Sequence, residues 1–136
     1  KSMGLAVEKL TNNQQTVLEL LEKSKEPLKA YAILFDIQKK GIKAPLQVYR
    51  ALDKLIEIGK VHKIESKNSY IACKHKNCDS STSTSFLICE TCDQVTELKK
   101  NNLSAYFTKQ SEQANFKYAK HNLEIYGTCK NCKKKH

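Results

Sequence analysis

Six cysteines, all between Cys73 and Cys132, are the residues of this chain best suited to chemistry. Four of them form two Cys-x-x-Cys pairs, Cys89 with Cys92 and Cys129 with Cys132. Each pair suits a tight turn that points two thiolates at one ion, and two pairs complete a tetrahedral zinc site of the structural kind. A single pair could instead be a redox dithiol, so a thiol-disulfide oxidoreductase is the alternative interpretation. Two pairs in one small segment favour zinc.

A second group of potential metal ligands surrounds residue 73. A thiolate, an imidazole and a carboxylate could hold zinc there, with Cys73 and His62 as the first two ligands. Alternatively, Cys73 is a small buried apolar residue and His62 a surface side chain, and spacing alone favours this second interpretation. The remaining cysteine and histidines are Cys78, His75, His121 and His136.

Composition limits the class of protein. The chain has 136 residues, room for at most two small domains, and its formal net charge is +10. Each half carries +5, from 13 basic and 8 acidic side chains in residues 1–73 and 11 and 6 in residues 74–136. This charge permits nucleic acid as a partner. With no long apolar run or signal-peptide pattern, we expect a cytoplasmic protein. No hydrolase or transferase motif is evident, so we expect no enzyme.

Three helices are predicted in the first half of the chain, before the cysteines. Thr11 and Gln14 fit a capping box that begins a helix ending near Lys23. The second helix is expected over residues 28–40, with Pro27 in its first turn. The third is expected to begin at Pro45 and to be closed by Gly59. Its inward face comprises Val48, Ala51, Leu52 and Leu55.

The opposite face of the third predicted helix has the side chains of a DNA-reading helix. Gln47 and Arg50 point outward near its start, with Tyr49 at the edge. A recognition helix meets base edges at this end, and arginine can donate two hydrogen bonds to guanine. Alternation in residues 61–64 and 69–72 then predicts a β-hairpin. Three helices and a hairpin indicate a winged helix-turn-helix. A small helical domain with a solvated charged face is the equally weighted alternative.

The second half is predicted to mix strands and a helix between the cysteine pairs. Strands are expected at residues 86–88, 95–98 and 123–126, and an amphipathic helix at 103–114. Such a layer is small to be stable alone, so zinc and dimerisation would both help it. The helix is expected to turn inward Leu103, Tyr106 and Phe107.

Several ordered motifs resemble those of the ferric uptake regulator family over essentially the whole chain. The run from residue 61 to 73 is most similar to the zinc uptake regulator branch. The motifs are VYRAL at 48–52, VHKIES at 61–66, NSY at 68–70, FLICETC at 86–92 and HNLEIYG at 121–127.

The resemblance implies an α+β protein with an N-terminal winged helix-turn-helix followed by a small α/β dimerisation domain. It places the DNA-binding domain at residues 1–73, a hinge at 74–83, and the dimerisation and zinc-binding domain at 84–136. The implied partners are double-stranded operator DNA, at an AT-rich palindrome, and a second copy of the chain. Neither a membrane nor a small-molecule substrate is expected.

The resemblance also assigns site residues, and it implies two zinc ions per chain, one structural and one regulatory. Tyr31 and Arg50 match base-contacting residues. His62, Cys73 and Glu97 match three of the four regulatory zinc ligands. The structural zinc ligands would be Cys89, Cys92, Cys129 and Cys132.

Some positions depart from the family pattern. The fourth regulatory ligand is usually a histidine shortly before the strand with the first cysteine pair, yet residues 80–85 contain only serine and threonine. Cys78 or His75 could replace it, and Cys78 is favoured because a second thiolate would bind zinc tightly. The His-x-His pair of iron- and peroxide-sensing members is absent. His121 matches an extra metal position of some relatives and is expected to be structural here. The usual Pro-Gln-Arg is replaced at residues 12–14.

These observations predict a zinc-responsive repressor that binds operator DNA as a dimer and controls zinc uptake genes. Regulatory zinc would tie the wing and the hinge to the dimerisation domain and so set the spacing of the two recognition helices. The alternative within the family is a regulator that has structural zinc only, or that responds to iron or peroxide.

Overall fold

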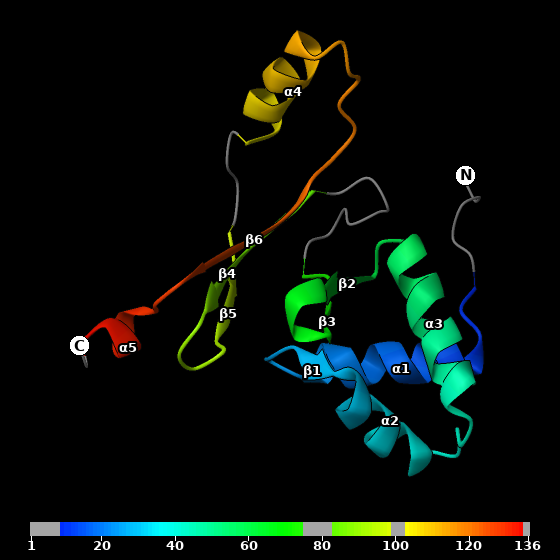
Figure 1. Cartoon of the computed structure of the whole chain (residues 1–136). Coiled ribbons are helices and arrows are strands. Elements are labelled where there is room, and N and C mark those ends of the chain that lie inside the picture. Colours follow the sequence, from blue (N-terminus) through cyan, green and yellow to red (C-terminus); the bar gives the residue numbers. More distant parts are fainter. Residues whose placement is uncertain (1–8, 75–82, 99–102, 135–136) are drawn as a thin grey trace. The chain divides into compact units, whose positions relative to one another are not determined.

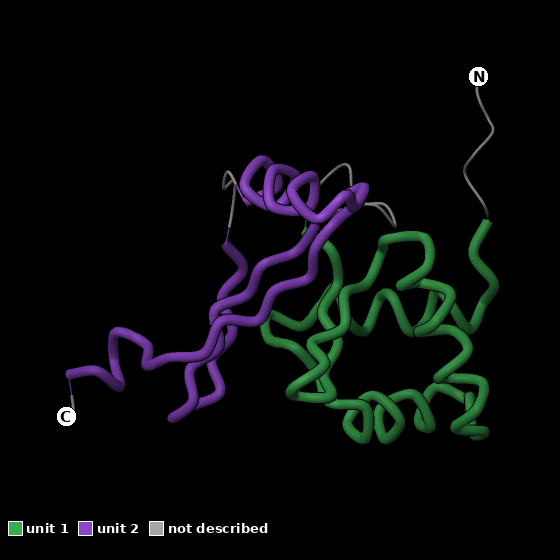
Figure 2. Tube along the Cα trace, turned by 45° about the horizontal axis from the view of Figure 1, so that its top comes forward, with its two compact units in different colours: residues 1–80 green, residues 81–136 purple. Residues whose placement is uncertain are grey.

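The computed structural model describes residues 9–74, 83–98 and 103–134 of the chain (Figure 1). The chain divides into two compact units, residues 1–80 and residues 81–136 (Figure 2). Each unit has its own three-stranded sheet, with strand order β1-β3-β2 in the first and β5-β4-β6 in the second. Among the described residues, no helix has the length and apolarity needed to cross a membrane.

Two helices of the first unit begin and end as predicted. Helix α1 (Asn12–Lys23) begins with a capping box in which Gln14 N donates to Thr11 Oγ1 and Thr11 N donates to Gln14 Oε1. Helix α3 (Pro45–Glu57) has Pro45 in its first turn, where a missing N–H costs nothing. Gly59 follows with a φ of +82°, a conformation that favours glycine over other residues. The predictions for both helices are confirmed.

The predicted start of the second helix is wrong. Helix α2 (Ala30–Gln38) begins two residues later, because Leu28–Lys29 form strand β1. Leu28 pairs with Tyr70, and Ala30 N donates to Asn68 O at 3.2 Å. These backbone groups thus find partners in a strand far along the sequence, which outweighs the local helical pattern after Pro27.

The predicted hairpin is confirmed and completes a winged helix. Strands β2 (Val61–Ile64) and β3 (Ser69–Ala72) pair antiparallel, joined by a 3-10 turn (Glu65–Lys67). Asn68 closes the turn with a φ of +46°, which asparagine tolerates better than most residues. The three helices and the sheet enclose one core, whose fully buried members include Val17, Leu21, Ile33, Ile37, Val48, Leu52, Leu55 and Val61.

The second unit has the predicted strands and helix. Strand β4 (Thr84–Cys89) is central, antiparallel to β5 (Val95–Glu97) and parallel to β6 (Asn122–Gly127). Helix α4 (Leu103–Gln113) lies between β5 and β6 in sequence, and such a crossover permits the parallel pairing. A short helix α5 (Lys130–Lys133) follows β6.

Helix α4 does not bury the face that its pattern predicts. Tyr106 is 56% exposed, and no residue of the helix is buried. Figure 1 shows the helix beyond one end of the strands, not across a face of the sheet. Phe107 is half-buried against the rings of Tyr118 and His121, whereas Tyr106 touches only the edge of Phe107 among the ring contacts of the described residues. The inward prediction is therefore wrong for Tyr106.

Candidate metal centre and DNA-binding surface

The structure brings the two cysteine pairs together in the second unit. Cys89 ends β4, and Cys129 directly precedes α5. The parallel register sets Cys89 beside Gly127, so the second pair begins two residues after this alignment. The ligand atoms of all four cysteines lie within 4.8 Å of one another. The pairing of β4 with β6 is therefore sufficient to bring the two cysteine pairs together.

The sulfur positions fit a tetrahedral zinc ion. Zinc–sulfur bonds of about 2.3 Å place neighbouring sulfurs about 3.8 Å apart in a tetrahedron. The Sγ atoms of Cys92 and Cys129 are 3.7 Å apart. Cys89 and Cys132 are buried, whereas Cys92 is exposed, so the cluster lies at the surface with two of its ligands covered. Four cysteines in this geometry could hold one metal ion without further ligands.

Backbone groups prepare one sulfur of the cluster as a thiolate. The backbone N–H groups of Cys129 and Cys92 donate to Cys89 Sγ at 3.3 and 3.5 Å, and they lower the pKa of Cys89 to about 6. Contact with the Cys129 thiol, together with burial, raises the pKa of Cys132 to about 12. Without a cation the crowded sulfurs therefore resist full ionisation, and a bound divalent ion would relieve their mutual repulsion.

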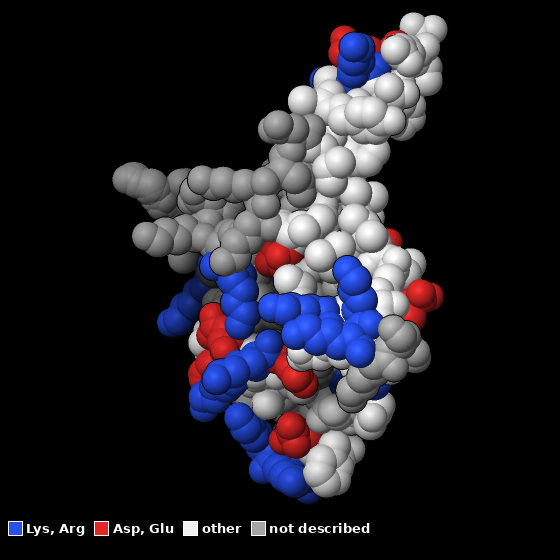
Figure 3. Space-filling model, turned by 90° about the vertical axis from the view of Figure 1, so that its left-hand side faces the viewer, with Lys and Arg blue, Asp and Glu red and all other residues white. Residues whose placement is uncertain are grey.

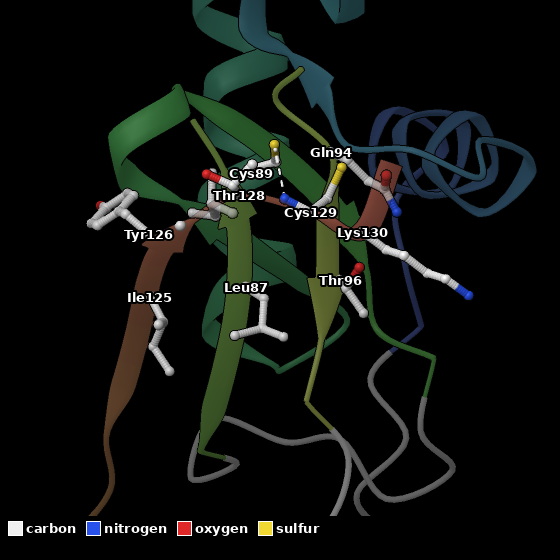
Figure 4. Close-up of a pocket in the computed structure, with 11 residues that line it drawn as sticks. Leu87, Cys89, Gln94, Thr96, Ile125, Tyr126, Thr128, Cys129 and Lys130 are labelled. Atoms are coloured by element: carbon white, nitrogen blue, oxygen red, sulfur yellow. Dashed lines mark hydrogen bonds between the residues drawn. The ribbon is translucent and has the colours of Figure 1, made fainter. Parts of the chain in front are cut away.

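A cavity of ≈ 380 Å³ lies on the sheet face next to the cysteines. Figure 4 shows the sulfur atoms of Cys89 and Cys129 at one end of it and the side chains of Leu87 and Ile125 along the strands. Leu87 and Ile125 are neighbours in the β4–β6 register, and they are 39% and 41% exposed. The unit thus presents an apolar surface beside its cysteine cluster.

The expected regulatory ligands fall in both units. His62 pairs directly with Ile71, and Cys73 N extends the ladder by donating to Lys60 O at 2.9 Å. Cys73 therefore lies diagonally opposite His62 on one face of the hairpin, and both are half-buried. Cys73 is a disulfide cysteine in this structure. Glu97 ends β5, opposite Phe86. The two candidates for the fourth ligand, His75 and Cys78, lie outside the described residues.

The four expected DNA-contacting residues are all exposed on the first unit. Tyr31 is 70% exposed in the first turn of α2, and Tyr49 is 38% exposed on α3. Gln47 and Arg50 are exposed on the same helix, opposite the buried face that the sequence predicts. Figure 3 shows many Lys and Arg side chains on the face in view, with Asp and Glu among them. A helix with this division of faces can enter a DNA groove while its apolar side stays in the core.

A hydroxyl network around His121 is a feature that the sequence analysis missed. Tyr118 Oη lies 2.6 Å from His121 Nδ1, and Ser85 Oγ lies 3.4 Å from Nε2. Ser83 Oγ accepts from His121 N at 3.2 Å. Burial lowers the pKa of His121. The alternation of Ser83 and Ser85, which places both on one face of the strand, was the available signal. The network supports the structural role expected for His121.

Comparisons with known proteins cover most of the chain. Residues 6–126 match the model of the Ferric uptake regulator family. The chain is 33% identical over 125 residues to the Zinc uptake regulation protein of Escherichia coli (strain K12), covering 91% of this chain and 72% of that protein.

Two solved structures are similar along most of their length. One is holo XcZur, with a TM-score of 0.81, 35% identity, and coverage of 93% of this chain and 87% of that one. The other is a zinc uptake regulator complexed with zinc and DNA, with a TM-score of 0.82, 30% identity, and coverage of 93% and 84%. Family model, sequence identity and fold agree: the chain belongs to the ferric uptake regulator family.

Proposed function

We propose that the chain is a cytoplasmic, zinc-responsive transcriptional repressor that binds operator DNA as a homodimer and controls zinc uptake genes. The observation that carries the proposal is the combination of an exposed recognition helix and a four-cysteine cluster in one chain. It is supported by the similarity to a zinc uptake regulator complexed with zinc and DNA. A regulator needs no catalytic group, and we assign none.

The first zinc ion is structural and is held by Cys89, Cys92, Cys129 and Cys132. The 3.7 Å separation of two of the sulfurs supports this assignment, as does the set of four thiol ligands without an open position for substrate. Binding there contributes folding free energy, because the unfolded chain has no preformed site. The convergence of both pairs, with all four ligand atoms within 4.8 Å of one another, favours a shared metal ion over a thiol-disulfide oxidoreductase, which needs only one pair.

The second zinc ion is regulatory, with His62, Cys73, Glu97 and Cys78 as ligands. Support comes from the hairpin, where diagonal neighbours such as His62 and Cys73 are about 7–8 Å apart at Cα, a span that one ion and two side chains can bridge. Cys73 must be a reduced thiol to bind zinc. Two zinc ions per chain follow, of which this one is the switch.

The binding free energy that this switch requires lies within the range usual for allosteric proteins. Shifting a population from 1:99 to 99:1 needs about 5.5 kcal/mol of differential binding. A dimer with two regulatory ions divides this requirement, so that each ion supplies roughly half, within the usual range of allosteric coupling. Zinc that ties the wing to the second unit would fix the spacing of the recognition helices at one suited to a palindromic, AT-rich operator.

The second copy of the chain is proposed to cover the apolar surface of the second unit. Leu87, Ile125 and Tyr126 are between 39% and 49% exposed, and strand β6 has a free edge among the described strands. Helix α4 buries none of its residues within one chain. A dimer would cover these apolar side chains and give the small unit the core that it lacks.

The DNA contacts are assigned to Tyr31, Gln47, Tyr49 and Arg50. Arg50 would donate two hydrogen bonds to a guanine, so Arg50→Ala is expected to cost about 1–3 kcal/mol on operator DNA and much less on random DNA. Equal losses on both would make Arg50 a phosphate contact. Lys54, one turn further on and half-exposed, is the matched control: Lys54→Ala should weaken both DNAs alike.

The proposal is tested by titrating reduced protein with buffered zinc and measuring bound zinc and operator affinity in parallel. We expect one zinc that resists exchange, and a second whose filling at higher free zinc coincides with operator binding. Cys73→Ser should abolish binding of the second zinc and leave binding of the first unchanged. If only one zinc binds and resists exchange, and operator affinity does not depend on free zinc, the chain is a regulator of this family without a zinc-dependent switch.

A further inference from the structure

Leu46 is an exposed apolar residue at the start of the recognition helix. It is the second residue of α3, directly after Pro45, and it is 58% exposed. The apolar residues that follow it on the helix, such as Val48 and Leu52, are buried. A single exposed leucine is common on protein surfaces, so its exposure alone indicates nothing. Its position relative to the other exposed residues is informative.

Leu46 shares a helix face with two of the assigned DNA contacts. Residues three and four apart are neighbours on a helix surface, so Leu46 lies beside Tyr49 and Arg50. All three are exposed. If Arg50 reaches base edges in the major groove, Leu46 enters the same groove one turn nearer the helix start.

We propose that Leu46 recognises the C5-methyl group of a thymine in the operator. The major groove presents one apolar group at its base edges, this methyl group, and apolar side chains recognise it by contact. An exposed leucine in the groove cannot hydrogen-bond a base, and facing a polar base edge would desolvate that edge without compensation. The inference rests on the proposed function and adds a specificity residue to it.

Helix and DNA geometry locate this thymine. One helical turn is about 5.4 Å long, and successive base pairs are about 3.4 Å apart. Leu46 and Arg50 are about one turn apart along α3. The thymine therefore lies one or two base pairs from the guanine that Arg50 reads, once in each half-site.

The test uses the full-length, zinc-loaded protein and a duplex that it selects from a pool of random DNA. Each thymine of that duplex is replaced in turn by deoxyuridine, which removes the methyl group and leaves the base pair intact. We expect affinity to fall about fourfold at one thymine per half-site, the factor for uncovering one methyl-sized group. That thymine should lie one or two base pairs from the guanine that Arg50 reads. This guanine is identified as the one whose replacement lowers the affinity of the unsubstituted protein but not the affinity of Arg50→Ala.

Two variants separate a methyl contact from other roles of Leu46. Leu46→Ala removes the contact from both half-sites of the dimer, so it should bind the thymine duplex about sixteenfold less tightly, and its affinity should not change when either thymine is replaced by deoxyuridine. Leu46→Met keeps a long apolar side chain, so it should retain most of the difference in affinity between the thymine duplex and the deoxyuridine duplex. Both should melt like the unsubstituted protein, since Leu46 lies outside the core.

Two results would overturn the proposal. If Leu46→Ala keeps the full sensitivity to deoxyuridine, or if no thymine methyl near the guanine affects the unsubstituted protein, Leu46 does not read a methyl group, while the repressor function stands. If the zinc-loaded protein selects no duplex at all, the repressor function fails, and the assignment of Leu46 fails with it.

Discussion

Cys92 Sγ lies 3.7 Å from Cys129 Sγ, although 37 positions separate the two residues in the sequence. The parallel pairing of β4 with β6 produces this proximity, because Cys89 and Gly127 are aligned at the end of the two strands. The cluster therefore closes the segment that contains β5, α4 and β6. A metal ion there would link the first and last strands of the second unit, so metal binding and folding of this unit should depend on each other.

Cys89→Ser should abolish zinc binding at the cluster and unfold the second unit or prevent its dimerisation. Structural zinc contributes about 10–16 kcal/mol in small zinc domains, comparable to the whole stability of a domain, about 5–15 kcal/mol. Zinc content, sedimentation and circular dichroism would report the loss. Cys73→Ser is the matched control and should remain a folded dimer. A stable, zinc-free Cys89→Ser dimer would contradict the structural assignment.

Zinc affinity at the cluster should fall as the pH falls. With a pKa of about 12, Cys132 carries a proton at pH 7 that zinc must displace, whereas Cys89, with a pKa of about 6, is already a thiolate. Below pH 6 the Cys89 thiolate also takes up a proton, so the dependence should steepen there. Competition with a chelator between pH 5 and 8 measures this. An affinity that does not change over that range would show that the thiols are not the ligands.

Protonation of His121 should destabilise the second unit. Its pKa is lowered from 6.5 by burial, so below that value the unfolded chain binds the proton more readily than the folded chain does. The contribution of His121 to stability is therefore complete above pH 6.5 and is lost as the pH falls through the folded-state pKa. The difference in unfolding free energy between the unsubstituted protein and His121→Gln should shrink over this range. A constant difference would contradict the prediction.

Tyr118→Phe should destabilise the same unit by about 1 kcal/mol, the usual net contribution of a hydrogen bond. The substitution keeps the ring that stacks on Phe107 and removes the hydroxyl 2.6 Å from His121 Nδ1. Urea unfolding of zinc-loaded protein gives the difference. No measurable loss of unfolding free energy in Tyr118→Phe would show that the hydroxyl network around His121 does not stabilise the second unit.

Thr11→Ala should destabilise the first unit by about 1 kcal/mol, because it removes the side-chain cap of α1. Thr16→Ala is the matched control: Thr16 Oγ1 donates to Asn12 O within the helix, an interaction that adds little to helix stability. Urea unfolding compares the two. Equal effects would mean that the capping box does not set the start of α1.

Local patterns predicted most elements of this fold. The capping box at Thr11, the division of α3 into an apolar and a polar face, and the alternation in the hairpin each depend on residues within a few positions of one another. The two cysteine pairs could also be identified from the sequence, because the ligand spacing within each pair is local. For these features sequence and structure agree because short-range sterics and hydrogen bonding determine them.

The errors and omissions concern partners distant in the sequence. Residues 28 and 29 are a strand because Tyr70 and Ser69 offer their backbone groups. Tyr106 is exposed because α4 extends past the sheet.

The sequence by itself determined the chemistry available to this protein: four thiols in two pairs, an arginine and a glutamine at the start of a helix, and a hairpin beside them. Tertiary structure alone decided which groups meet. It set Cys92 beside Cys129 through strand pairing, gave His121 its hydroxyl partners, and left Leu46 exposed on the face of Arg50. The physical reason is that residue type and local spacing specify what a side chain can do, whereas contacts between distant segments follow from burial and backbone pairing over the whole unit.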